Sequence, residues 1–194
     1  RARQAEATRR LLIDTARANF TENGYAATSI DDVIRSAGVA RGALYHHFAG
    51  KEALFRAVYD TVEAEVVAKV LAAAGAQANP FESVRAGLSA FLDACLDPSF
   101  RRIVVLESVS VLHSEVGDPT VEPVELPMLR TVLEPLLATG AFAGSGVEAL
   151  AYVSLGGLYG ASLHIARAAD PHAARADVDG VLDALIDGIV NALS

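Results

Sequence analysis

The residues whose types suggest chemistry gather in one short stretch of the sequence. A helix predicted over residues 41–47 carries an arginine, a tyrosine and two histidines, and Leu44 is its one large aliphatic side chain. Such a helix has little to bury, and its outward groups suit a surface that enters the major groove of DNA. Lys51 opens the next helix, where a cation beside free backbone N–H groups is expected to bind a phosphate.

A helix over residues 30–37 is expected to position this surface. Ser29 is a candidate N-cap, and Asp32, three residues later, completes a pattern like a capping box. Gly38 supplies the turn between the two helices. From this spacing alone, an ordinary helical hairpin with a solvated polar face is an equally good interpretation.

Catalysis is not expected. His113, His164 and Glu107 can be assembled into a triad on paper, but the sequence contains no nucleophile elbow, phosphate-binding glycine loop or paired metal-ligand motif. His46 and His47 are adjacent, so on a helix their side chains point about 100° apart and do not share a metal ion. We therefore expect neither an enzyme nor a metal or other cofactor.

Charge is distributed unevenly along the 194 residues. The net charge is −8, but residues 1–51 hold eight Lys or Arg against five Asp or Glu, which gives +3 there and −11 in the remainder. A modestly basic head on an acidic body fits a protein that touches phosphates at one end. The first ten residues contain four arginines and no apolar segment, which favours a basic arm over a targeting signal.

The remaining composition is typical of a cytoplasmic globular protein with a sizeable core. Hydrophobic residues make up 52% of the chain, and Cys95 is the only cysteine, which excludes an intrachain disulfide.

Helical periodicity continues through the rest of the sequence. Residues 5–23 form a first helix that Gly24 ends, and residues 51–74 form a fourth that connects two domains. Further helices are expected to start at Asn79-Pro80, Asp97-Pro98 and Asp170-Pro171, because each pair places a capping side chain before a proline. The second of these should continue as one helix through residue 113. Three prolines then interrupt the pattern, and a helix follows over residues 128–138.

The helix expected over residues 147–168 has no formal charge between residues 149 and 166. Gly156 and Gly160 form a G-x-x-x-G pattern, so a membrane span has to be considered. Polar and small residues dilute the apolar run, and we therefore predict a helix buried on all sides, with no membrane contact. One of its faces would meet a second subunit and another a ligand.

Residues 11–55 resemble the DNA-binding domain of the TetR/AcrR family of bacterial transcriptional regulators. The matching positions span three helices and two turns: Ile13, Ala16, Phe20, Gly24, Tyr25, Thr28, Ala37, Gly38, Val39, Leu44, Tyr45, His47, Phe48, Lys51, Glu52, Ala53, Leu54 and Phe55. Ala40, Ala43 and Gly50 depart from the family pattern at positions that usually carry a hydroxyl or capping residue. Weaker DNA binding than the consensus would give is therefore expected.

The resemblance implies an all-α fold of about nine helices. Residues 1–50 would form a helix-turn-helix domain, and residues 51–194 a larger domain for ligand binding and dimerisation. It implies a homodimeric regulator, usually a repressor, that a small molecule releases from a pseudo-palindromic double-stranded DNA operator. The alternative is a helical ligand-binding or interaction protein that does not act through DNA.

Three groups of residues are assigned on this basis. Those expected at DNA are Thr28, Ser29, Arg41, Gly42, Ala43, Tyr45, His46, His47 and Lys51. Those expected at a largely apolar effector are Phe91, Cys95, Leu106, Glu107, Ser110, His113, Met128, Leu129, Leu133, Tyr152, Leu155 and Tyr159. Those expected between subunits are Gly156, Gly157, Gly160, His164, Leu182, Leu185, Ile186 and Ile189. Glu107 is singled out because an unpaired buried carboxylate is costly, so a partner such as Arg102, Arg130, His113 or the ligand is expected.

Overall fold

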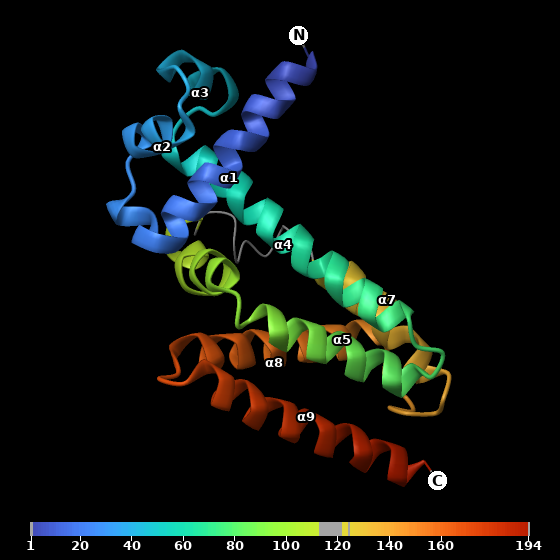
Figure 1. Ribbon diagram of the computed structural model, residues 1–194. Helices are drawn as coiled ribbons and strands as arrows, with labels where there is room; N and C mark the ends of the chain where they lie inside the picture. The colour runs from blue at the N-terminus through green and yellow to red at the C-terminus, as the bar shows by residue number, and fades with distance from the viewer. Residues whose placement is uncertain (1, 113–121, 124, 194) are drawn as a thin grey trace. The chain divides into compact units, whose positions relative to one another are not determined.

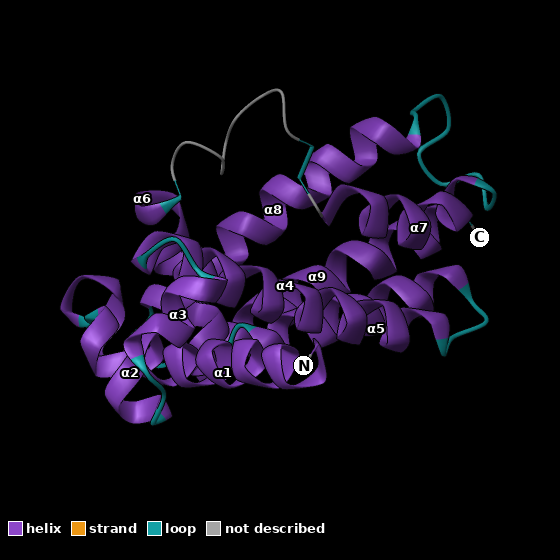
Figure 2. Cartoon of the chain, turned by 90° about the horizontal axis from the view of Figure 1, so that it is seen from above, coloured by secondary structure: helices purple, strands orange, loops and turns teal. Residues whose placement is uncertain are grey.

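The computed structural model describes residues 2–112, 122–123 and 125–193. All regular secondary structure in these residues is helical, as Figures 1 and 2 show, which confirms the predicted all-α class. The chain divides into two compact units. Among the described residues, the first unit contains 2–64 and 98–112, and the second contains 65–97, 122–123 and 125–193.

The first unit is built on α1 (Ala2–Ala27), which contacts α2 (Ile30–Ala37), α3 (Arg41–His47) and the segment after residue 97. Leu12, Ala16 and Phe20 lie along the inner face of α1 and are fully buried. Rings of Tyr25 and of Phe55, from α4 (Lys51–Gly75), pack against Phe20 with centroids 5.1–5.9 Å apart. This aromatic cluster fixes the start of α4 beneath the turn that follows α1.

Gly24 interrupts the first helix where the sequence predicted its end, although α1 continues beyond this kink to Ala27. Gly24 has φ 80° and ψ 168°, a conformation that is essentially restricted to glycine, and it kinks α1. A Cβ at this position would lie 2.6 Å from Oε1 of Glu107 and closer still to the guanidinium of Arg102. Gly24 is therefore required both by its backbone conformation and by the close approach of the later segment.

The described part of the chain does not contain the single α-helix that the sequence predicted from Pro98 through residue 113. Residues Phe100–Glu107 form a π-helix, η1, and only the short α6 (Ser108–Val111) follows it. In an α-helix, two residues that are five apart in sequence point about 140° away from one another around the helix axis. In a π-helix, where hydrogen bonds join residues i and i+5, the same two residues lie on one face. Arg102 and Glu107 are five apart, and their Nε and Oε1 atoms are 3.2 Å apart in an ion pair.

The second unit contains the end of α4 together with four helices. These are α5 (Pro80–Ala94), α7 (Glu125–Leu137), α8 (Val147–Arg167) and α9 (Pro171–Ala192). The caps predicted for α5 and α9 are confirmed, because Asn79 Oδ1 accepts from two backbone N–H groups at 2.8 and 3.2 Å and Asp170 Oδ1 from two at 3.0 and 3.1 Å. In this unit α5 packs on α7 and α9, and α8 packs on α7 and α9 (Figure 1).

α7 begins three residues earlier than predicted and contains two prolines. Pro127 lies in the first turn, where a missing backbone N–H costs no helical hydrogen bond, and the helix ends two residues after Pro135. The sequence pattern placed the helix start after Pro127 because it treated that proline as part of a loop.

The prediction that residues 147–168 are buried on all sides is wrong for the single chain. Only 17% of the most apolar window of α8 is buried, although this helix is long and apolar enough to meet the length and hydropathy criteria for a membrane span. Tyr152, Val153 and Tyr159 are at least half exposed. The helices α7 and α9 pack on α8, and these exposed side chains leave part of its surface open.

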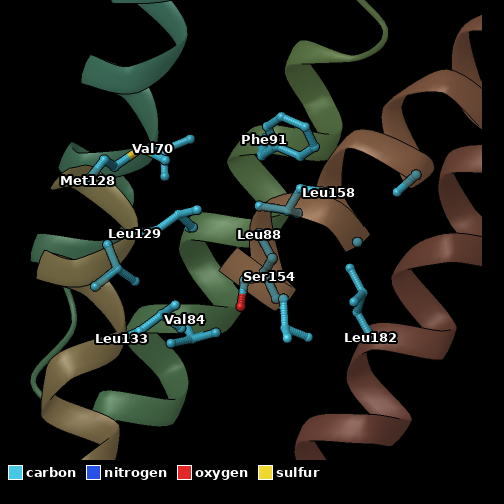
Figure 3. Close-up of a pocket in the computed structure, with 15 residues that line it drawn as sticks. Val70, Val84, Leu88, Phe91, Met128, Leu129, Leu133, Ser154, Leu158 and Leu182 are labelled. Carbon is cyan, nitrogen blue, oxygen red and sulfur yellow. The ribbon is translucent and has the colours of Figure 1, made fainter. Parts of the chain in front are cut away.

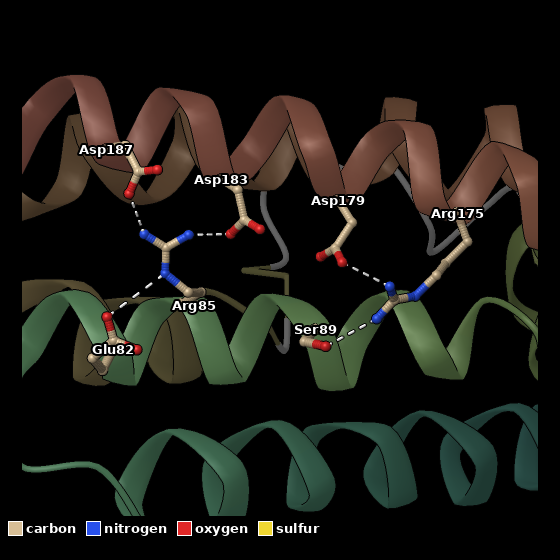
Figure 4. A network of polar contacts seen from close by, with 7 residues as sticks. All are labelled: Glu82, Arg85, Ser89, Arg175, Asp179, Asp183 and Asp187. Atoms are coloured by element: carbon tan, nitrogen blue, oxygen red, sulfur yellow. Dashed lines mark hydrogen bonds and ion pairs between the residues drawn. The ribbon is translucent and has the colours of Figure 1, made fainter.

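Ion pairs join α5 to α9 along the second unit (Figure 4). Arg85 contacts Asp183 and, at 2.8 Å, Asp187, while Arg175 lies 2.7 Å from Asp179 and 3.1 Å from Asp93. Burial alone would lower the pKa of Arg85, but the hydrogen bonds to Asp183 and Asp187 outweigh it and raise that pKa. Three aspartates of α9 are thus used in ion pairs within this unit.

Candidate nucleic-acid interface and ligand cavity

Local hydrogen bonds fix the turn between α2 and α3. The capping box is present, because the Ser29 hydroxyl accepts from the Asp32 N–H at 3.1 Å and the Asp32 carboxylate accepts from the Ser29 N–H at 3.1 Å. Gly38 ends α2 in the left-handed conformation at φ 65°. Ala40 makes no side-chain cap to α3, as its residue type requires.

α3 presents its polar side chains to solvent. Leu44 is fully buried and anchors the helix, whereas Arg41 and His46 are exposed and Tyr45 is 48% exposed. Gly42 is also exposed, and a Cβ added there would meet nothing within 4 Å. The helix therefore offers a narrow surface with three polar side chains and room for close approach of another molecule.

The Arg41 side chain is held in place before any partner binds. Its guanidinium lies 2.9 Å from the Asp31 carboxylate and 5.8 Å from the centre of the Tyr45 ring. The hydrogen bond that Arg41 donates to the Tyr45 hydroxyl oxygen and the negative charge of Asp31 raise the pKa of Arg41, so it carries its positive charge throughout the physiological range. A fixed guanidinium loses less conformational freedom when it binds the edge of a base.

Lys51 and Thr28 lie close to this surface but are held differently. The Lys51 ammonium lies 4.1 Å above the Tyr25 ring and 3.5 Å from the Ala26 carbonyl oxygen. Thr28 is 3% exposed, and its hydroxyl donates to the Gly24 carbonyl oxygen at 2.8 Å. The structure thus assigns Thr28 to the interior of the turn, in contrast to its predicted place at a phosphate.

A cavity of about 290 Å³ lies within the second unit (Figure 3). Fourteen of its fifteen lining residues are apolar or glycine, and Ser154 supplies the one hydroxyl. The lining comes from five helices: Val70 of α4; Val84, Gly87, Leu88 and Phe91 of α5; Met128, Leu129, Val132 and Leu133 of α7; Val153, Ser154, Gly157, Leu158 and Ala161 of α8; and Leu182 of α9. A mostly apolar cavity between helices is typical of a small-molecule site.

Sequence comparison matches both parts of the chain to one family. Residues 12–58 match the family described as bacterial regulatory proteins, tetR family, and residues 81–189 match the tetracyclin repressor-like C-terminal domain. The chain belongs to the TetR family. The resemblance that residues 11–55 suggested is therefore confirmed and extends to the larger helical part.

Relatives of this TetR-family chain differ in how much of it they share. A TetR-family transcriptional regulator from Pectobacterium atrosepticum is 32% identical, with 97% of each chain covered and a TM-score of 0.82. An uncharacterised helix-turn-helix-type regulator of Bacillus subtilis is 29% identical over 76% of this chain and 78% of that protein. The A-factor receptor protein of Streptomyces griseus is 44% identical over 33% of this chain, and the match spans a quarter (25%) of that receptor.

Of the residues assigned to a ligand in this TetR-family chain, Phe91, Met128, Leu129 and Leu133 line the cavity. Glu107 does not, because its carboxylate pairs with Arg102 and accepts from the Tyr25 N–H at 2.8 Å in the first unit. The other assigned residues that the structure describes also lie outside the cavity lining: Cys95, Leu106, Ser110, Tyr152, Leu155 and Tyr159. His113 lies outside the described residues.

The cavity residues that sequence reasoning missed share one property. Nearly all are aliphatic or glycine and lie on helices whose apolar faces were recognised, for example Val84, Leu88 and Leu158. Their residue types carry no signal that separates a cavity wall from a filled core. Ser154 is the one polar residue among them, and in the sequence it is simply one of the polar residues that make α8 less like a membrane span.

The residues assigned to a subunit interface fall into two groups. Those of α8 and one of α9 are exposed: Gly156, Gly157, Gly160, His164 and Leu185. Ile186, in contrast, is 8% exposed, Leu182 lines the cavity and Ile189 is half-buried, so these three face partly into their own unit. Gly157 also borders the cavity.

Proposed function

We propose that this chain acts as a homodimeric transcriptional regulator that binds DNA through α3 and releases it when a small molecule enters the cavity of the second unit. Ligand-responsive repression is the usual role in the TetR family. The observation that carries the proposal is the outward face of α3, where Leu44 anchors the helix and Arg41, Tyr45 and His46 point to solvent. A helix this short and polar gains its function from a partner that meets those groups.

DNA contacts divide into two kinds. Arg41, Tyr45 and His46 are assigned to base edges, and Ser29, His47 and Lys51 to phosphates. Ser29 is exposed at the N-terminus of α2, although its hydroxyl already donates to the Asp32 carboxylate at 2.6 Å. We therefore expect its contribution at a phosphate to come mainly from the backbone groups at the helix start.

The second copy is expected to cover the open face of α8 and α9. Val153, Tyr159, Val181 and Leu185 are between 50% and 74% exposed on these two helices. Apolar side chains of this size gathered on neighbouring helices are typical of a protein–protein interface. We propose that the two α3 helices of such a dimer enter successive major grooves, which lie about 34–36 Å apart on a pseudo-palindromic operator.

An electrophoretic mobility shift with DNA that flanks the gene for this chain tests the proposal. We expect a complex with one fragment at low ionic strength and loss of that complex in Tyr45→Ala and Arg41→Ala variants. Arg167→Ala is the matched control, because it removes one exposed arginine from the other unit. If the purified protein binds no fragment, the proposal fails and the DNA-independent ligand-binding alternative is favoured.

Sedimentation velocity tests the dimer separately. Leu185→Glu places a charge on the open apolar face and should convert a dimer into monomers that keep their helical circular dichroism spectrum. A wild-type protein that sediments as a monomer at micromolar concentration would contradict the assignment of this face.

A further inference from the structure

The size of the cavity limits what it can hold. An apolar cavity of about 150 Å³ accommodates benzene, which has six non-hydrogen atoms. The cavity in the second unit has about twice that volume, 290 Å³. It therefore suits a compact molecule of roughly ten to fifteen non-hydrogen atoms.

The lining excludes a charged occupant. No Asp, Glu, Lys, Arg or His is among the residues that line the cavity. Three arginines of this unit are paired with carboxylates and are therefore not available to an anion: Arg85 with Asp183 and Asp187, Arg130 with Glu122 and Glu148, and Arg175 with Asp93 and Asp179. An isolated carboxylate or ammonium group buried here would lose its hydration without gaining a counter-charge.

Ser154 is the exception in this apolar lining. Its side chain points among the labelled apolar residues of the cavity (Figure 3), and its hydroxyl makes no hydrogen bond with the part of the chain that the structure describes. Other hydroxyls on this unit's helices do bond to the backbone, as Ser162 does with the Tyr159 carbonyl oxygen at 2.8 Å. A hydroxyl left open inside an apolar cavity is a position where a ligand gains from a matching polar group.

We propose that the effector is an uncharged, largely hydrocarbon molecule with a hydroxyl or carbonyl group that hydrogen-bonds to the Ser154 hydroxyl. Its hydrocarbon part lies against Leu88, Phe91, Leu129 and Leu158. This inference rests on the proposed function in taking the cavity as the effector site. It adds the chemical class of the effector and the residue that orients it.

Three probes of one shape test the inference: naphthalene, 2-naphthol and 2-naphthoate, each titrated into the full chain by calorimetry or by their own fluorescence. We expect 2-naphthol to bind roughly threefold to tenfold more tightly than naphthalene, which corresponds to one net hydrogen bond. The charged 2-naphthoate should bind at least about 100-fold more weakly than 2-naphthol.

Two variants localise the binding. Ser154→Ala should remove the preference for 2-naphthol over naphthalene, and it should fold normally because the hydroxyl has no partner to lose and alanine favours helix. Ala161→Leu fills the cavity from α8 and should weaken both neutral probes at least about tenfold. A circular dichroism melt of each variant verifies that it is folded.

Several results would overturn the inference. These are binding of 2-naphthoate as tight as that of 2-naphthol, an unchanged preference in Ser154→Ala, unchanged binding in Ala161→Leu, or no binding of either neutral probe up to its solubility. DNA binding without neutral-probe binding overturns this inference alone. Neutral-probe binding with no DNA fragment bound overturns the proposed function and leaves the assignment of the cavity standing.

Discussion

Replacing Gly24 with alanine should destabilise the first unit strongly. At φ 80° and ψ 168°, a residue with a Cβ is strained by about 1–3 kcal/mol. The added Cβ also lies 2.6 Å from Oε1 of Glu107 and closer still to the Arg102 guanidinium, so both side chains must shift, which weakens the hydrogen bond that Oε2 of Glu107 accepts from the Tyr25 N–H at 2.8 Å. Loss of a hydrogen bond to a charged group costs about 1.5–3 kcal/mol. Because side-chain shifts relieve part of the clash, we expect a total of about 2–5 kcal/mol.

Thermal unfolding followed by circular dichroism measures this effect. For a chain of this size, 1 kcal/mol lowers Tm by about 2–4 °C, so Gly24→Ala should lower Tm by about 4–20 °C. Gly42→Ala is the control, because Gly42 lies within α3, has no atom within 4 Å of an added Cβ, and should gain about 0.5–1 kcal/mol from the better helix former. If Gly24→Ala unfolds within 2 °C of the wild type, neither the strained backbone nor the packing of η1 against the kink has the importance argued above.

Three further predictions concern single side chains. Lys51→Ala should weaken binding to all duplexes alike and reduce the slope of log K against log salt concentration by roughly one. The control Lys69→Ala should change neither quantity. A changed sequence preference in Lys51→Ala would contradict its assignment to a phosphate. Hydrogen bonds from the Ser29 hydroxyl and backbone N–H lower the pKa of Asp32 from 3.8. The wild type should therefore be more stable than Asp32→Asn above pH 3.8, and this difference in stability should shrink as the pH falls through the lowered pKa. Urea unfolding midpoints of both proteins measure the difference, and a difference that stays constant in acid would refute the prediction. Burial raises the pKa of the Cys95 thiol to about 12, so at pH 8 it should react with a thiol reagent only after unfolding, and rapid labelling of the native chain would show that the site opens.

Local structure was predictable from the sequence where neighbouring residues decide it. The Ser29 capping box and the Asn79 and Asp170 caps each depend on a side chain that reaches a backbone group within three residues, and the left-handed Gly38 depends on the tolerance of glycine for positive φ. Such contacts form in any tertiary context, so residue type and spacing are enough to predict them. The kink of α1 at Gly24 belongs to the same class.

The sequence was insufficient where a residue's role depends on a distant part of the fold. Thr28 has the right type for a phosphate contact, but its burial depends on how α1 closes over it. The open face of α8 was equally unpredictable, because a helix without charges has the same sequence whether its cover is its own chain or a second copy. Residue type alone therefore shows which contacts a side chain is able to make, but it does not show which partner the side chain meets.

Glu107 and Ser154 illustrate how a polar residue type can mislead or inform a search for a ligand site. Glu107 was predicted to contact a ligand or a cation because a buried carboxylate without a partner is costly. In the structure its carboxylate pairs with Arg102 and accepts a hydrogen bond from the Tyr25 N–H. Ser154 was not among the residues predicted to contact a ligand, because a lone serine on a helix commonly bonds to the preceding turn. Its hydroxyl is nevertheless the group that the described structure leaves open inside an apolar cavity. A satisfied charge stabilises the fold, whereas a polar group without a partner in an apolar cavity is the one that a ligand can satisfy, and this difference is why the effector assignment rests on Ser154.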